Sequence, residues 1–179
     1  MSQRDHVDVI VAQWQHERPD LDSSTMGIIG RIDRLSPILD AQLTRVFSAH
    51  GLDFPGFDVL ASLRRSGAPY ELTPGQLAAS MMVTPGAVTQ RLARLEKQGL
   101  IERTHSTSDR RKVTVSLTPQ GLRIVDEAVA DHCRNEQAIL SIYTAEERTV
   151  LVDLLRRLLI QTGGEVSPDV GVAESNACA

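Results

Sequence analysis

Apolar side chains recur at three- and four-residue steps along most of the chain, and this spacing predicts amphipathic helices. Pro37 lies inside the second run of this kind, where a proline favours a kink. Gly51 follows the same run and can end its helix. The pattern predicts helices over residues 5–18, 24–50, 54–67 and 119–142, and a last helix that begins at the capping box of Thr144 and Glu147.

A threonine followed by a proline occurs at three further places: Thr73-Pro74, Thr84-Pro85 and Thr118-Pro119. Threonine caps the start of a helix with its side-chain oxygen, and proline is favoured at the first helical position. We therefore expect helices to begin near residues 74, 85 and 119. The first two would cover residues 74–81 and 85–98 and would be joined by a tight turn.

The hydrophobic period changes after Gly99. Residues 100–104 form a short extended run, and Val113, Val115 and Leu117 alternate with polar residues. This alternation predicts a β-hairpin whose tip is the polar segment between the two runs. Two helices joined by a tight turn and followed by a hairpin are typical of a winged helix-turn-helix. The predicted fold class is mainly α with a small β-wing.

The charge of the chain is unevenly distributed. Seven basic and three acidic side chains give residues 84–112 a formal charge of +4, which leaves −8 on the rest of a chain whose net charge is −4. A basic patch on an acidic body attracts a polyanion locally while the body discourages unspecific binding. The charge distribution therefore favours nucleic acid as a partner.

The second predicted helix of the motif carries side chains that can read DNA. Val88, Leu92 and Leu95 are spaced to face the core of the domain. Arginine and glutamine make bidentate contacts to guanine and adenine edges, and threonine contacts the thymine methyl group. The same outward face on an isolated helix is more often simply solvated. The candidate DNA-binding residues are Thr84, Thr89, Gln90, Arg91 and Arg94 on this helix, and Arg110 and Arg111 at the hairpin tip.

The segments LAASMMVTPGAVTQRLARLEKQGLIER and STSDRRKVTVSLTPQG resemble the MarR family of winged-helix transcription regulators over residues 28–160. This resemblance implies a homodimer that is formed by the N- and C-terminal helices and binds pseudo-palindromic double-stranded DNA. It also implies that Arg111 enters a minor groove, with Asp109 and Arg103 bracing the wing. The leucines that would form the dimer interface are Leu151, Leu155, Leu158 and Leu159.

The N-terminal helix with its tryptophan is similar to the urate-responsive subgroup of this family. There a tryptophan, an aspartate and two arginines bind the ligand, and the matching residues are Trp14, Asp58, Arg91 and Arg103. Taken alone, Trp14 is more often a core residue, and Asp58 with Arg103 is more often a structural ion pair. The resemblance implies a repressor released by a small anion such as urate. A carboxylate or phenolic ligand, or oxidation, is the alternative.

Several classes of function are disfavoured by what the sequence lacks. It contains no apolar run of the roughly 20 residues that span a bilayer and no export signal, so we expect a cytoplasmic protein without membrane contact. Neither a nucleophile motif, a phosphate loop nor a metal-ligand spacing occurs, so we expect no enzyme, cofactor or metal. Cys133 lies at a position typical of the core. A winged-helix module that binds protein rather than DNA is the competing hypothesis.

The predicted organisation divides the chain into four parts. Residues 1–50 hold an extra helix and a dimerisation helix, and residues 51–118 form the DNA-binding domain. Residues 119–162 are the C-terminal dimerisation helices. We expect the tail, residues 163–179, to be disordered because it offers little apolar surface to bury.

Overall fold

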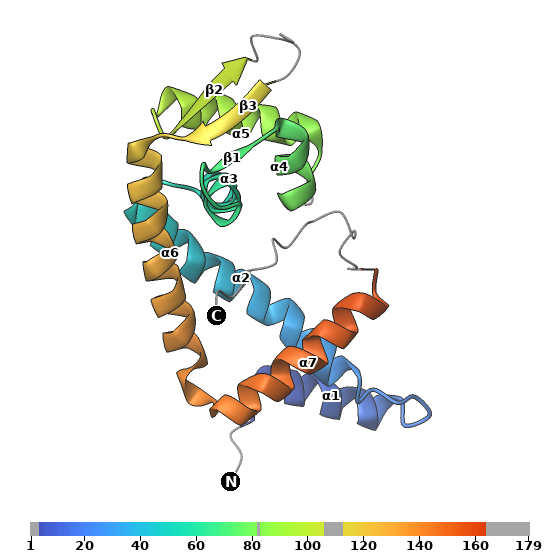
Figure 1. The fold of residues 1–179 in the computed structure, drawn as a ribbon. Coiled ribbons are helices and arrows are strands. Elements are labelled where there is room, and N and C mark those ends of the chain that lie inside the picture. Colours follow the sequence, from blue (N-terminus) through green and yellow to red (C-terminus); the bar gives the residue numbers. More distant parts are fainter. Residues whose placement is uncertain (1–3, 82, 106–112, 164–179) are drawn as a thin grey trace, which may run out of the picture. The chain divides into compact units, whose positions relative to one another are not determined.

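The computed structural model describes residues 4–81, 83–105 and 113–163 of the 179-residue chain. The chain divides into two compact units, Met1–Arg45 and Val46–Ala179. In chain order the elements are α1 (His6–Glu17), α2 (Met26–Ala49), α3 (Phe54–Arg65), β1 (Glu71–Leu72), α4 (Pro74–Met81), α5 (Pro85–Lys97), β2 (Ile101–His105), β3 (Val113–Leu117), α6 (Pro119–Ile139), the 3₁₀ turn η1 (Leu140–Ile142) and α7 (Ala145–Gln161) (Figure 1).

The first unit is built from α1 and most of α2. Asp5 caps α1 in a capping box, because its side chain accepts from the Val7 and Asp8 amides while the Asp8 carboxylate accepts from the Asp5 amide. Val7 is the buried residue of α1, and its side chain packs against Gly30 of α2. Arg31 of α2 donates to the carboxylates of both Asp5 and Asp8. The N-terminal helix is therefore fixed to α2 of its own chain.

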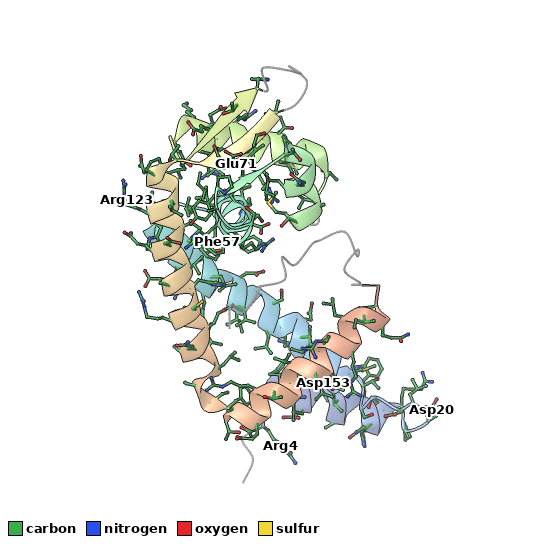
Figure 2. The ribbon with its side chains drawn as sticks, in the orientation of Figure 1. Arg4, Asp20, Phe57, Glu71, Arg123 and Asp153 are labelled. Carbon is green, nitrogen blue, oxygen red and sulfur yellow. The ribbon has the colours of Figure 1, made fainter. Side chains whose placement is uncertain are left out.

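The second unit has an apolar core between α3, α4, α5, α6 and a small sheet. Its strands follow the order β1-β3-β2, all antiparallel, and Val115 of β3 lies opposite both Leu72 and Arg103. Phe57 lies among the core side chains on α3 (Figure 2), with its ring stacked on Phe47 at a centroid distance of 4.1 Å. The fully buried side chains of this core include Leu60, Leu63, Leu77, Leu92, Val88 and Val125.

The start of α6 is docked closely against the end of α5. The Thr118 hydroxyl donates to the Gly99 carbonyl at 2.7 Å and accepts from the Gly121 amide at 3.0 Å, which caps α6. The Thr118 amide in turn donates to the Leu100 carbonyl at 3.1 Å. A Cβ added at Gly121 would lie only 1.9 Å from that carbonyl oxygen. The position therefore requires glycine because two stretches of backbone meet there.

The fold class predicted from the sequence is confirmed: the chain is mainly helical with a small antiparallel sheet. Two short elements, the two-residue strand β1 and the turn η1, were not predicted. The predicted core position of Cys133 is wrong, because this residue is exposed. Helix α2 runs through Pro37 as one helix. Within the described residues, no helix is both long and apolar enough to cross a membrane.

Candidate nucleic-acid interface

Helix α5, the second helix of the α4–α5 pair, has one apolar and one polar face. Thr84 caps α5 by accepting a hydrogen bond from the Ala87 amide at 3.4 Å, as the Thr-Pro pattern predicts. The apolar face is buried through the side chains of Val88, Leu92 and Leu95. Thr84, Thr89 and Gln90 are exposed on the other side. This is the division of faces that a recognition helix needs.

Arg91 does not extend outward with them. Its side chain is 21% exposed, and Nη1 lies 3.7 Å from Oδ2 of Asp58, which is equally buried. The same nitrogen is 3.8 Å from the Met81 sulfur. Burial raises the pKa of the Asp58 carboxyl above its ordinary value, while the positive charges of Arg65 and Arg91 partly oppose the rise. Two of the four predicted ligand residues are thus brought together between α3 and α5.

Arg65 adds a second cation near Asp58 and joins α3 to α4. One of its nitrogens donates to the Ser80 hydroxyl at 2.7 Å, the Ser80 carbonyl at 3.0 Å and the Ser62 hydroxyl at 3.1 Å. Ser62 is only 1% exposed, so this polar group is satisfied inside the core. Asp58 therefore lies near two arginines, and one of them, Arg65, also links the hydroxyls of Ser62 on α3 and Ser80 on α4.

Arg94, one turn after Arg91, also points toward α3. Its Nη1 lies 2.5 Å from Oδ2 of Asp53, the residue that caps α3 by accepting from the Gly56 amide at 3.0 Å. Both side chains of this ion pair are about half exposed, with 55% for Arg94 and 44% for Asp53. Arg94 therefore has a carboxylate partner within the chain.

Arg103 lies on β2, as predicted, but its ionic partner is Glu96 of α5. Nε lies 3.2 Å from the Glu96 carboxylate, at an angle that does not form a hydrogen bond. Within the described part of the chain, no ion pair connects Arg103 with Asp58. The pair that forms instead ties the first wing strand to the end of α5.

Trp14 lies in the other unit, on α1. Its phase along the helix matches that of Val7, yet its side chain is 46% exposed, so it is not the core residue that its spacing alone favours. The indole lines a surface hollow of about 730 Å³ together with Val9, Ala12 and Gln13 of the same helix. Its aromatic face is thus accessible.

The remaining predicted residues fall into two groups. Asp109, Arg110 and Arg111 lie outside the described residues. On α7, Leu155, Leu158 and Leu159 are exposed, and the helix has no buried residue. The α2 side chains Ile28, Ile29, Ile32, Leu35 and Ile38 are exposed as well.

Comparison with known proteins identifies the family. A model of the MarR family matches residues 55–113, which run from α3 to the start of β3. The transcriptional regulator PecS of Dickeya dadantii is 43% identical over 83% of this chain and 90% of its own length. The chain belongs to the MarR family.

Solved structures of other MarR-like proteins match the fold. A mutant of MarR from E. coli in complex with operator DNA has a TM-score of 0.64 and 27% identity, covering 82% of this chain and 97% of its own. BpsR of Bordetella bronchiseptica, whose DNA binding is regulated by 6-hydroxynicotinic acid, has a TM-score of 0.63 and 26% identity over 72% and 90% of the two chains. The MarR-family fold is thus shared over nearly the full length of both solved chains.

Sequence reasoning missed the partners that hold the arginines of this MarR-family domain. No role was predicted for Asp53, although its position directly before Phe54-Pro55 was a signal that could have located it at the cap of α3. Glu96 and Arg65 carry no such signal, because their ion pairs and hydrogen bonds depend on how α3, α4, α5 and β2 pack. Ion-pair partners are the part of the site that needs tertiary structure.

Proposed function

We propose that this chain is a transcription repressor that binds pseudo-palindromic DNA as a homodimer and leaves it when a small planar anion binds. Family membership supports regulation of transcription. The exposed polar face of α5 supports DNA recognition, with the wing-tip residues Arg110 and Arg111 as further contacts. The observation that carries the ligand response is the half-buried Asp58–Arg91 pair, which connects α3 to the recognition helix.

DNA binding is tested with a duplex from the region upstream of the gene. We expect a specific complex whose affinity falls steeply with salt, because arginines and lysines displace counterions from phosphates. Arg111→Ala should weaken the complex by about 1–3 kcal/mol if its side chain occupies a groove. A wild-type protein that binds no duplex at low salt would instead support a winged-helix module for protein contacts.

Dimerisation is proposed to use the leucine stripe of α7. Leu155 and Leu158 are exposed apolar side chains, and covering such a side chain is worth about 1.5–3 kcal/mol. The variant Leu155→Lys with Leu158→Lys should therefore be a monomer by light scattering and should lose DNA binding. Ile160→Lys is the matched control, since Ile160 is exposed on the opposite side of the same helix. Dimers that persist in the double variant would place the interface elsewhere.

The ligand is proposed to compete with Asp58 for Arg91. A planar anion offers the guanidinium a bidentate partner. Movement of α5 would then alter the distance between the two recognition helices of the dimer, which must match half-sites roughly 34–36 Å apart. Urate is the first candidate because of the resemblance in Trp14, Asp58, Arg91 and Arg103. An aromatic carboxylate is the second, supported by the BpsR likeness.

The ligand proposal is tested by thermal shift and DNA release with urate and 6-hydroxynicotinate. We expect one of the two to raise the melting temperature of free protein and to dissociate the DNA complex. The double variant Trp14→Phe, Arg103→Gln should bind DNA without responding, whereas Asp58→Asn, which removes the carboxylate that competes for Arg91, should respond at a lower ligand concentration. A response that survives the double change would place the ligand at another site.

A further inference from the structure

Helix α3 carries two carboxylates that each hold one arginine of the recognition helix. Asp58 faces Arg91 at 3.7 Å, and Asp53 faces Arg94 at 2.5 Å. The later carboxylate pairs with the earlier arginine, so the two ion pairs join α5 to α3 at two separate points. Because Arg91 and Arg94 are one turn apart, both lie on the same side of α5.

The Asp53 carboxylate is fixed before it meets Arg94. Its Oδ1 accepts the hydrogen bond from the Gly56 amide that caps α3, which leaves Oδ2 for the guanidinium. An anchored carboxylate loses less freedom on pairing than a mobile one, so this exposed ion pair is better ordered than most.

The two helices also contact each other beside this pair. A Cβ added at Gly56 would lie 2.9 Å from Oδ1 of Asp53 and 3.5 Å from Cδ2 of Leu95. Leu95, the neighbour of Arg94 along α5, is only 2% exposed. The last turn of α5 is thus held to the first turn of α3 by an apolar contact and by the Asp53–Arg94 pair together.

We infer that Asp53 and Arg94 are positioning residues that fix the last turn of the recognition helix, and that Arg94 does not neutralise a DNA phosphate. Recognition helices read bases mainly with their N-terminal residues, and Arg94 lies in the last turn of α5. The inference rests on the proposed DNA binding and assigns Arg94 a role different from the base or phosphate contact that the sequence suggests.

The test measures DNA affinity against salt for Asp53→Asn, Arg94→Gln and the double variant. Asparagine caps helices as well as aspartate does, so Asp53→Asn removes the negative charge that pairs with Arg94 while keeping the cap. The probe is the upstream duplex that the wild-type protein binds, with fluorescence anisotropy at several KCl concentrations. Arg111→Ala serves as the control for a cation proposed to contact DNA.

Each single variant and the double variant should weaken binding by the same factor, about two- to fivefold, the range of an exposed ion pair. The slope of log K against log salt should stay at the wild-type value in all three. The inference is overturned if Arg94→Gln lowers that slope by about 1, as loss of one phosphate contact does, or if Asp53→Asn leaves affinity unchanged or raises it. If the wild-type protein binds no duplex, the proposed function fails instead.

Discussion

Replacing Gly121 by alanine tests whether the contact between α6 and the end of α5 determines the position of the recognition helix. The added Cβ would lie 1.9 Å from the Leu100 carbonyl oxygen, whereas real Cβ contacts are essentially never shorter than 3.0 Å. The start of α6 must therefore move by about 1.1 Å or more, the difference between these distances. The obstacle is backbone, which cannot rotate out of the way as a side chain can.

The expected loss of stability follows from the hydrogen bonds near Gly121. The shift disturbs the 3.1 Å bond from the Thr118 amide to Leu100 and the 2.7 Å bond from its hydroxyl to Gly99. Overpacking costs about 1–3 kcal/mol and each hydrogen bond contributes roughly 0.5–1.5 kcal/mol, while alanine recovers about 1 kcal/mol of helix propensity. We expect a net loss of about 1–5 kcal/mol in the free energy of unfolding.

The assay is thermal unfolding followed by circular dichroism, at one protein concentration because dimerisation would shift the midpoint. A loss of this size lowers the melting temperature by roughly 2–20 °C in a chain of this length. Gly75→Ala is the matched control: Gly75 lies in the first turn of α4, where a Cβ would meet nothing within 4 Å. If both variants melt within about 2 °C of the wild-type protein, the close contact does not constrain the domain.

Two further predictions concern carboxylates whose pKa the fold shifts. Burial raises the pKa of Asp58, so the folded state loses stability relative to the unfolded chain as pH rises from 3.8 through the folded pKa. Asp58→Asn should therefore be at least as stable as wild type at pH 7, measured by urea unfolding, and a clear loss would show that its ion pair outweighs the burial cost. The hydrogen bond from Arg31 lowers the pKa of Asp8. The ionised Asp8 therefore stabilises the folded state above pH 3.8, and this stabilisation is lost as pH falls through the folded pKa. Trp14 is the single tryptophan of the chain, and its fluorescence emission should change over that acid range in the wild-type protein but not in Arg31→Met. Identical titrations of the two proteins would mean that the contacts of Arg31 do not hold α1.

Local chemistry made part of the fold predictable. The Thr-Pro pairs set the starts of α4, α5 and α6, because a cap and a fixed proline backbone act within a few residues. Strand β1 was not predictable in this way, since Glu71 and Leu72 become a strand only by pairing with Ser116 and Val115 far along the chain. Trp14 shows the same limit. Its position around the helix can be predicted from the sequence, but the exposure of its side chain cannot.

The candidate site was likewise only partly predictable from the sequence. The arginines of α5 can be located from the sequence, whereas the carboxylates that hold them depend on how α3 packs against α5. Asp53 and Asp58 are five residues apart and so lie on different sides of α3. Each can meet an arginine only because α5 crosses α3 at a specific angle.

The two ion pairs between α3 and α5 should respond differently to salt and to a bound anion. Asp53 and Arg94 are half exposed, so dissolved ions screen their attraction, while Asp58 and Arg91 are each 21% exposed and are screened less. The anion proposed to bind Arg91 would replace Asp58, the carboxylate of the pair that salt screens less. If such an anion and DNA both depend on α5, the factor by which the anion weakens DNA binding must equal the factor by which DNA weakens anion binding. A common factor measured from both sides therefore distinguishes coupling through α5 from an anion that only raises the ionic strength.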